Sequence, residues 1–494
     1  GAMSDDDASA ASGEYGEDNQ QPLLHTLNLY FQSNGVPSSG STLNELHDLK
    51  HVQGEDLDQF LPENFNELLC MGQSNSNDKE YKRLLYLLQS NRRWQRIGLS
   101  DYARNRASPE FLSLVVLAVT KTKHVSLYDC PMDQNFFACL SSGMQTLTNV
   151  EMMGGATSIS YEAAAVFANG LALSTSLETL SISQCSNFEH GAGLKLVEGI
   201  KRNKSLKDLA ICESNLSTVA MVSILRAVSE GTASKKLSTL YVTLKGASDC
   251  TKSLTKLMSS NTSHLENLTI LRVPGLRSPT FRGVDCSQNG NVGNRHLKSL
   301  EMRDSILDDS YLTSILPAIP MLLHLKLTRC GLCGLCYMTP IIEHLRRPST
   351  VIRSIDLPGN GIGWNQVEVF VTHLADMQSL TDVDISGNPW CDEVNRDLER
   401  FEKIVRMLSR CWNLEQFEFG LLSDREANVV KTSNLDLNLA INRAWRRELC
   451  YKESSHSSKL LPLIIARAIR KSEHSSLGPD VILSLLRERI GDFV

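Results

Sequence analysis

One arrangement of apolar residues recurs along most of the chain. An apolar residue is followed three positions later by a second and two positions after that by a third, twelve times between Trp94 and Phe419. The starts lie 25 to 34 residues apart. Alternation of buried and exposed positions is typical of a strand, so each triplet predicts a short strand. The triplets are Trp94-Ile97-Leu99, Thr122-Val125-Leu127, Leu147-Val150-Met152, Leu177-Leu180-Ile182, Leu206-Leu209-Ile211, Leu237-Leu240-Val242, Leu265-Leu268-Ile270, Leu297-Leu300-Met302, Leu322-Leu325-Leu327, Ile352-Ile355-Leu357, Leu380-Val383-Ile385 and Leu414-Phe417-Phe419.

The stretches between triplets have a different period. Leu194, Val197 and Ile200 recur at helical spacing, and residues 161–171 and 219–228 have a similar pattern. A period near 29 residues has room for one strand and one helix. Because helices are wider than strands, stacking such units bends the array. Trp94 and Thr122 are weak first positions, so we expect about 11–12 repeats.

The ninth position of the repeat gives a more specific comparison. It is Cys130, Cys185, Cys330, Asn360 or Asn388 in five units, and the pattern L-x-x-L-x-L-x-x-N/C resembles the leucine-rich repeat family. We expect these side chains to point inward and bond neighbouring backbone groups. Where other residues hold the position, we expect this ladder to be broken or locally irregular; they are Gly155, Ser214, Lys245, Val273, Ser305 and Leu422.

The predicted helices resemble those of the ribonuclease-inhibitor-like subfamily. Residues 439–447 also resemble a C-terminal element of uncharacterised repeat proteins of diatom-like algae. The resemblance covers residues 80–425 and implies an α/β leucine-rich repeat solenoid, a horseshoe with parallel concave strands, convex helices and a helical C-terminal cap. Such a fold hosts many functions and identifies none.

Four segments follow from these patterns. Residues 1–60 are predicted to be a disordered acidic tail, whose start, Gly1-Ala2-Met3, resembles a cloning remnant. Residues 61–93 are predicted to be a helical N-terminal cap, 94–425 the solenoid, and 426–494 the helical C-terminal cap.

Charge and composition narrow the partners. The net charge of −6 equals the six acidic residues of positions 1–20, which contain no Lys or Arg, so the rest sums to zero. Nucleic acid binding needs a basic face, so we expect no nucleic acid partner. The sequence contains no run of about 18 apolar residues, so we expect no membrane span. The absence of a secretory signal predicts a cytoplasmic protein, with the nucleus as an alternative, and 13 reduced cysteines.

Two local motifs could carry chemistry. Cys330, Cys333 and Cys336 have a spacing that zinc and iron–sulfur sites use. Cys330 is a ladder residue, however, so we expect no metal. The glycine-rich stretch 359–363 lacks the Lys-Ser/Thr of a phosphate loop and is predicted to be a repeat turn. No nucleophile–base–acid constellation is signalled, so we expect neither catalysis nor a cofactor.

The strand residues between the buried positions are the candidate binding site. They face away from the core and bring acids and bases together, which suits a folded protein partner. The candidates are Tyr128, Glu151, Met153, Tyr241, Glu301, Arg303, Lys326, Thr328, Asp356, Asp384 and Glu418. Residues 441–472 add a basic patch, for which a solvated face is the first interpretation; it comprises Arg443, Arg446, Arg447, Lys452, Lys459, Arg467, Arg470 and Lys471.

The resulting hypothesis is a non-catalytic scaffold that binds a protein through its concave face and is monomeric when unbound. One alternative is a substrate receptor of a ubiquitin ligase, because Leu461-Pro462 and the following helices resemble an adaptor-docking box. The other is a Ran-type GTPase-activating protein, a family that uses similar repeats.

Overall fold

The computed structural model divides the chain into two units, Gly1–Phe65 and Asn66–Val494, and all described residues belong to the second. The described residues are 67–72, 88, 94–101, 108–154, 158–185, 188–244, 248–272, 293–307, 309–391, 397–411, 413–420, 422–433, 435–436, 438–440 and 442–443. The predicted tail of residues 1–60 and most of both predicted caps lie outside them.

The strands of the second unit form one parallel sheet in which every strand pairs with its neighbours in sequence. This order is the one a solenoid requires, because each repeat contacts the repeats before and after it. The strands are β1 (Glu67–Gly72), β2 (Arg96–Asp101), β3 (His124–Tyr128), β4 (Asn149–Met153), β5 (Thr179–Ser183), β6 (Asp208–Cys212), β7 (Thr239–Thr243), β8 (Asn267–Leu271), β9 (Ser299–Arg303), β10 (His324–Thr328), β11 (Ser354–Asp356), β12 (Asp382–Asp384) and β13 (Gln416–Glu418).

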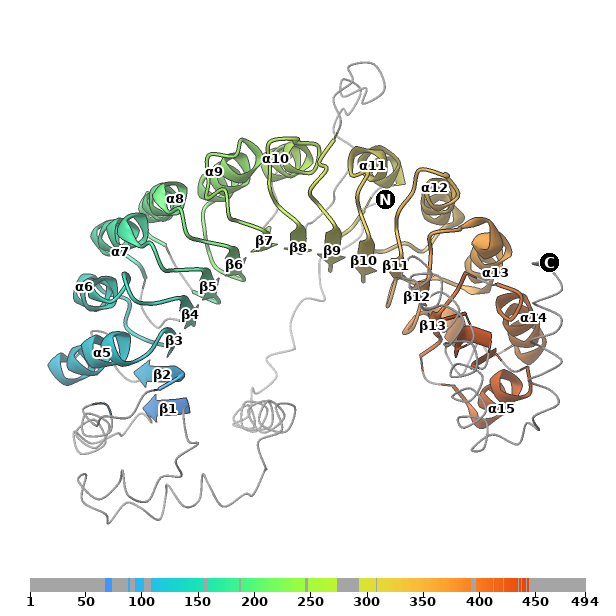
Figure 1. Ribbon diagram of the computed structural model, residues 1–494, viewed down its shortest axis with the longest axis horizontal. Coiled ribbons are helices and arrows are strands. Elements are labelled where there is room, and N and C mark those ends of the chain that lie inside the picture. Colours follow the sequence, from blue (N-terminus) through green and yellow to red (C-terminus); the bar gives the residue numbers. More distant parts are fainter. Residues whose placement is uncertain are drawn as a thin grey trace, which may run out of the picture. The chain divides into compact units, whose positions relative to one another are not determined.

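A helix follows almost every strand and covers the outer side of the sheet (Figure 1). The α-helices are α5 (Pro109–Lys121), α6 (Gln134–Ser142), α7 (Tyr161–Leu173), α8 (Ala192–Arg202), α9 (Thr218–Ser229), α10 (Ser248–Met258), α11 (Asp309–Ile315), α12 (Leu335–Leu345), α13 (Trp364–His373), α14 (Leu398–Leu408) and α15 (Asp424–Thr432). Short 3-10 turns are η4 (Leu316–Ala318), η5 (Leu374–Asp376) and η6 (Pro389–Cys391). The predicted α/β solenoid, with parallel strands inside and helices outside, is thus confirmed.

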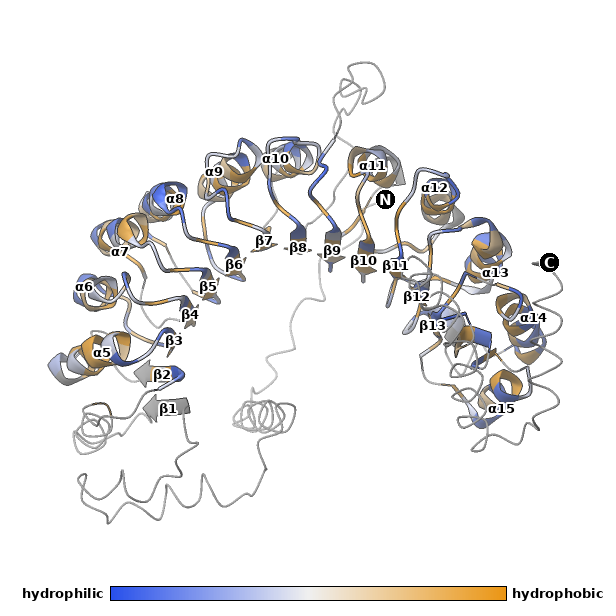
Figure 2. Cartoon of the chain, viewed as in Figure 1, coloured by the Kyte–Doolittle hydropathy of each residue, from blue (hydrophilic) through white to orange (hydrophobic). Residues whose placement is uncertain are grey.

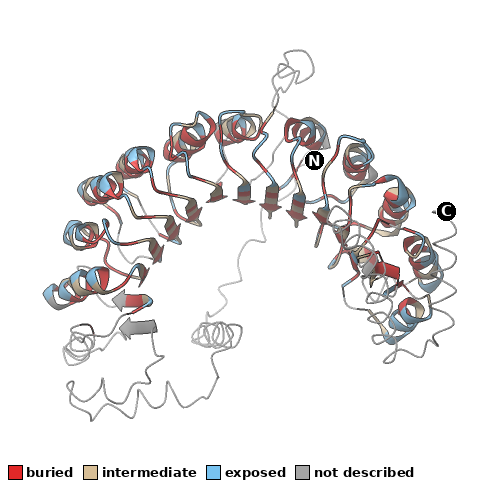
Figure 3. Ribbon diagram, in the orientation of Figure 1, coloured by how far each residue is buried: buried red, intermediate tan, exposed pale blue. Residues whose placement is uncertain are grey.

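All twelve predicted strands are present as β2 to β13, each containing the second residue of its triplet. Every triplet residue is buried, and none is more than 6 % exposed. Apolar and buried residues lie on the helix sides that face the sheet, while polar and exposed residues lie on the outer helix sides (Figures 2 and 3). β1 was not predicted, because its segment was assigned to a helical cap. Leu88, in the same segment, lies in a helix and is buried.

Side-chain caps and close contacts fix where the helices begin and how they pack. Ser160 and Ser217 are the N-caps of α7 and α9. Their side chains accept hydrogen bonds from the backbone N–H groups of Ala163 and Ala220, respectively. Gly199 of α8 lies directly against α7: a Cβ there would be 2.7 Å from both the Cα and the carbonyl oxygen of Ala168. Because glycine has no side chain, α7 and α8 can pack closely against each other at Gly199.

No helix in the described ranges is long and apolar enough to cross a membrane.

Candidate functional site

One residue from each of the strands β2 to β13 contributes to a single row across the inner face of the sheet. Strand register places them side by side, and each lies between two buried neighbours on its own strand. In order, the row contains Gly98, Ser126, Glu151, Ser181, Ala210, Tyr241, Thr269, Glu301, Lys326, Asp356, Asp384 and Glu418. We call this the central row; its charge changes along its length.

The first part of the central row carries a tight polar network around Glu151. The Arg96 guanidinium donates to Glu151 at 2.7 Å and to Ser126 at 2.9 Å. The hydroxyl of Ser126 donates to Glu151 at 2.9 Å, and His124 Nε2 lies 3.2 Å from the other carboxylate oxygen. Burial alone would raise the pKa of Glu151, but the bond to His124, the charge of Arg96 and the bond from Ser126 lower it to about 2. This carboxylate is therefore held ionised and in place.

This network contains serine, histidine and a carboxylate, but it lacks the geometry of a nucleophile relay. In such a relay the base uses one ring nitrogen for the serine and the other for the acid. Here the same atom, His124 Nε2, lies 3.2 Å from Glu151 and 3.4 Å from Ser126. Ser126 is 0 % exposed, so a substrate would not reach its hydroxyl. The cluster positions Glu151 and Tyr128, whose hydroxyl accepts from Arg96 at 3.2 Å.

The middle of the central row consists of small uncharged residues and one aromatic residue. Ser181, Ala210 and Thr269 flank Tyr241, which is half-buried. Burial, with the nearby Cys212 next in importance, raises the pKa of the Tyr241 phenol. A tyrosine that is partly covered yet standing among small neighbours offers a rigid aromatic surface to a partner.

Beyond Tyr241 the charges are paired. The Arg303 side chain donates to Glu301 at 2.6 Å, and Lys326 Nζ lies 3.6 Å from the same carboxylate oxygen. Further pairs join side chains that directly follow the strands: Arg272 with Glu213 at 3.0 Å, and Arg329 with Asp304 at 2.5 Å and 3.0 Å.

Six residues that directly follow strands have a backbone in the left-handed region. Their φ values lie between 48° and 55°, a conformation that non-glycine residues adopt rarely. They are Asp129, Gln184, Glu213, Arg272, Asp304 and Arg329. This conformation turns the chain off the sheet, and the side chains of Arg272 and Arg329 are exposed.

The last three strands are dominated by acids. Asp356, Asp384 and Glu418 are consecutive members of the central row, and Asp382 lies beside them. Burial raises the pKa of Asp356, and the negative charges of Asp384 and Asp382 add to the effect, while Lys326 and Ser354 oppose it. We call these four carboxylates the acidic ridge.

The ladder under the turns has the predicted bonds. Asn388 is 0 % exposed and accepts from the backbone N–H groups of Asn360 and Ile362 at 2.6 and 3.1 Å, while its amide donates to Leu357 O at 2.8 Å. Cys185 donates to Gly154 O at 3.4 Å. The expected break at Ser214 is wrong: its hydroxyl donates to Ile182 O at 3.2 Å and accepts from Cys185 N at 3.3 Å. A buried hydroxyl supplies the same donor and acceptor as an amide at this position.

The three clustered cysteines are separated by the fold. Cys330 is buried in the ladder, where its thiol donates to Met302 O at 3.3 Å, and burial raises its pKa to about 12. Cys333 and Cys336 are exposed. Within the described part of the chain no three His, Cys, Asp or Glu residues are grouped so as to hold a metal ion. In the glycine-rich stretch, Asn360 is buried and bonds Leu327 O, which makes this segment a repeat turn.

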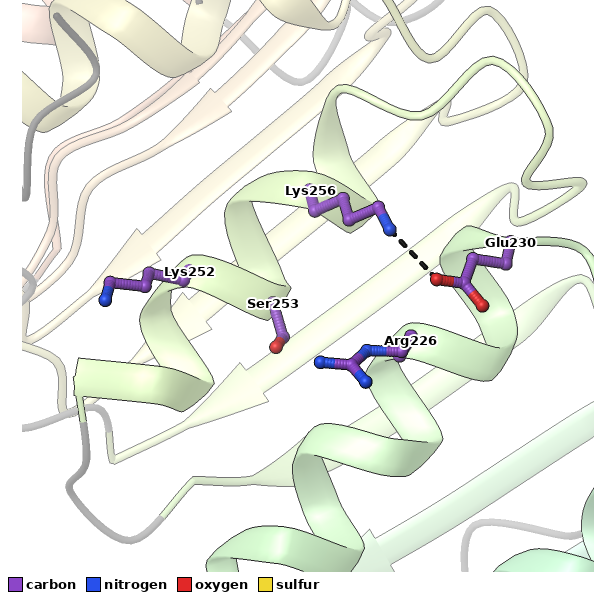
Figure 4. Close-up of a pocket in the computed structure, with 5 residues that line it drawn as sticks. All are labelled: Arg226, Glu230, Lys252, Ser253 and Lys256. Carbon is purple, nitrogen blue, oxygen red and sulfur yellow. Dashed lines mark hydrogen bonds and ion pairs between the residues drawn. The ribbon is translucent and has the colours of Figure 1, made fainter. Parts of the chain in front are cut away.

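The outer surface contains a shallow groove between α9 and α10 (Figure 4). It encloses about 290 Å³ and is lined by Arg226, Glu230, Lys252, Ser253 and Lys256. Lys256 bridges it by an ion pair of 2.9 Å to Glu230, and the Lys252 ammonium points away from Arg226. Exposed ion pairs of this kind join neighbouring repeats elsewhere, for example Lys207 with Glu178 at 2.8 Å.

Every predicted binding residue lies on a strand at a half-buried or exposed position. The structure brings Tyr241, Glu301, Arg303 and Lys326 together, as well as Asp356, Asp384 and Glu418. Tyr128 and Glu151 share the Arg96 network, whereas Met153, 46 % exposed, and Thr328 contact neither group through a hydrogen bond. Sequence reasoning missed Arg96, His124 and Ser126. Strand register was a usable signal for Ser126, which occupies the same repeat position as Glu151, whereas Arg96 and His124 align with Asn149, a position that holds no predicted binding residue.

One residue of the predicted basic patch is described. Arg443 donates to Glu415 O at 2.9 Å, and the preceding Asn442 donates to Cys411 O and Leu414 O at 2.8 and 2.6 Å. These bonds attach residues 442–443 to the segment just before β13, which gives Arg443 a structural contact. The other patch residues lie outside the described ranges: Arg446, Arg447, Lys452, Lys459, Arg467, Arg470 and Lys471.

Neither the scan of family models nor the search of curated proteins found a match for this chain.

Proposed function

We propose that this protein is a non-catalytic scaffold of the leucine-rich repeat family, ribonuclease-inhibitor-like in its helices, which binds a folded protein partner through the central row and the charged residues beside it. The observation that carries the proposal is the register of that row. It brings partly exposed side chains from the ten successive strands β4 to β13 into one row, with a different chemistry in each part.

The form of the surface favours a macromolecule over a small ligand. Small-molecule sites are concave pockets with apolar linings. The outer groove of Figure 4 and a void of about 10 Å³ in the core beside Phe137 both lie away from the central row. A broad face of parallel strands instead supports contacts spread over many residues, as protein interfaces require.

The charges favour a partner with its own polar pattern. Glu151 is fixed by its network, and Glu301 is shared by Arg303 and Lys326, so these groups need little rearrangement on binding. The acidic ridge has a single basic neighbour in the central row, Lys326. A partner that places lysine or arginine opposite Asp356 and Asp384 would relieve their mutual repulsion, so we expect the binding energy to depend on salt.

The partner is sought in source-cell lysate by capture on the immobilised full-length protein. The test variant changes Tyr241, Arg303 and Lys326 to alanine, and its matched control changes Tyr161, Arg226 and Lys252, the same residue types on the outer helices. Since tyrosine and arginine are the commonest energetic anchors of interfaces, we expect the concave variant to lose the captured protein by tenfold or more. Equal capture by both variants would contradict the proposal.

The two alternative functions gain no support from the described residues. Docking to a ubiquitin-ligase adaptor would depend on residues 455–494, which lie outside them. A GTPase assay on the full-length protein tests the Ran-type alternative, and we expect no stimulation of hydrolysis. We further propose a cytoplasmic or nuclear location and a monomer in the absence of partner.

A further inference from the structure

The cysteine motif contains an accessible pair that the binding function does not use. Of the nine cysteines whose side chains are described, only Cys333 and Cys336 are exposed. Within the described part of the chain, neither thiol makes a hydrogen bond. The third member, Cys330, is buried and hydrogen-bonded in the ladder, so the fold separates one structural thiol from two available ones.

The pair lies at the start of α12, close to two glycines. Cys333 precedes Gly334, the extended N-cap of α12 (φ −128°, ψ 157°), and Cys336 lies in the first turn of that helix. Gly331 has φ +71° and open space where a Cβ would lie. Glycines on both sides of Cys333 therefore allow the small rotation that a disulfide geometry demands.

The same loop is tied to the next repeat through its backbone and not through its sulfur. The carbonyl oxygen of Cys333 accepts a hydrogen bond from Gln366 Nε2 at 3.2 Å, and Gln366 Oε1 accepts from Gly363 N at 3.1 Å. Cys333 Cβ would be 3.1 Å from a Cβ at Gly361. The loop is thus tied to the next repeat through the Cys333 carbonyl, while the Cys333 thiol is exposed.

We propose that Cys333 and Cys336 form a thiol–disulfide exchange site whose oxidant is a disulfide such as oxidised glutathione. One cysteine thiolate attacks the oxidant, breaking its S–S bond and releasing one glutathione thiol. The second cysteine attacks the mixed disulfide, forms the Cys333–Cys336 bond and releases the second glutathione thiol. The protein loses two electrons and two protons, and both protons end on the two thiols released.

Cys330 does not compete in this reaction. Burial keeps its pKa at about 12, so its sulfur stays protonated, and only a thiolate attacks a disulfide. Its sulfur also bonds Met302 O inside the ladder, and pairing with Cys333 would break that bond.

The test oxidises the folded full-length protein with glutathione disulfide, blocks remaining thiols with N-ethylmaleimide, and examines the peptide containing all three cysteines by mass spectrometry. We expect loss of two hydrogens between Cys333 and Cys336 and no label on either, reversed by dithiothreitol, while Cys330 is labelled only after denaturation. C336S should instead retain one glutathione on Cys333. C139S, which changes a half-buried cysteine on α6, should behave as the wild type.

Three results would overturn the proposal. They are persistent labelling of both cysteines after oxidation, a stable glutathione adduct in the wild type, and a disulfide that includes Cys330 or a second copy of the chain. Circular dichroism of each variant before oxidation verifies that the chemistry is read from folded protein.

Discussion

Replacing Asn388 with alanine tests whether the ladder stabilises the array. Asn388 is fully buried, accepts two backbone N–H groups, and donates to three carbonyl groups, of Leu357, Ile385 and Ser386. Alanine leaves the N–H groups of Asn360 and Ile362 buried without an acceptor. Each unsatisfied group costs about 1–3 kcal/mol, so we expect a loss of about 4 kcal/mol from the free energy of unfolding of the C-terminal repeats.

The assay combines urea denaturation, followed by far-UV circular dichroism, with hydrogen exchange. Repeat arrays can unfold in parts, so the exchange rates of the Asn360 and Ile362 amides locate the loss. The matched control is Asn267→Ala. Asn267 is exposed and makes one bond of 3.4 Å to Thr239 Oγ1, so we expect a change under about 0.5 kcal/mol. If the two variants were equally stable and Asn360 exchanged at the wild-type rate, the ladder argument would be refuted.

Three further predictions concern single side chains. The pKa of Glu151 is lowered to about 2, so its ionisation stabilises the fold above a pH of about 4.5, and that contribution disappears as the pH falls toward 2. Urea titrations at a series of pH values should show the wild type losing about 1 kcal/mol of unfolding free energy over this range relative to Glu151→Gln, allowing for solvent screening. An unchanged difference between pH 6 and 3 would count against the network. The pKa of Asp356 is raised, so its charge is disfavoured in the folded state. Asp356→Asn should therefore raise the free energy of unfolding at pH 7 by about 0.5 kcal/mol in urea titrations, and this gain should shrink below pH 4. Gly199→Ala places a Cβ 2.7 Å from the backbone of α7 and should lower the free energy of unfolding by about 1–2 kcal/mol. The control Gly363→Ala meets only the flexible Gln366 side chain at 3.2 Å and should change it by less than about 0.5 kcal/mol. Equal effects of the two variants would show that α7 and α8 are not closely packed.

The fold was predictable because each repeat carries its own signal. Leu180 and Ile182, for example, are both buried, and the same positions are buried in every triplet, so one local rule applied twelve times identified the whole sheet. β1 has the same apolar spacing in Phe65, Leu68 and Cys70, and Leu68 and Cys70 pair with Ile97 and Leu99 of β2; it was missed because the segment was predicted to be a helical cap. The break expected at Ser214 was wrong, since a hydroxyl at this depth makes the same backbone bonds as asparagine.

The candidate site was predictable as positions but not as contacts. Alternation along each strand placed Glu151 and Glu301 on the inner face. It could not show that Arg96, two strands away, reaches Glu151, because that bond depends on how two turns of the solenoid align. Nor could sequence spacing show that Cys330 is buried while Cys333 and Cys336 are exposed. Burial there is decided by the turn, which places one thiol inside the ladder and leaves the loop outside.

Photo-crosslinking in source-cell lysate tests the concave-face proposal most directly. A photoreactive residue is placed at Ser181, in the middle of the central row, or at Val219, which is 62 % exposed on α9. If the concave face binds a folded protein, Ser181 yields a discrete crosslinked species that is lost in the Tyr241/Arg303/Lys326 variant, and Val219 does not. A discrete species from Val219 alone would contradict the proposal.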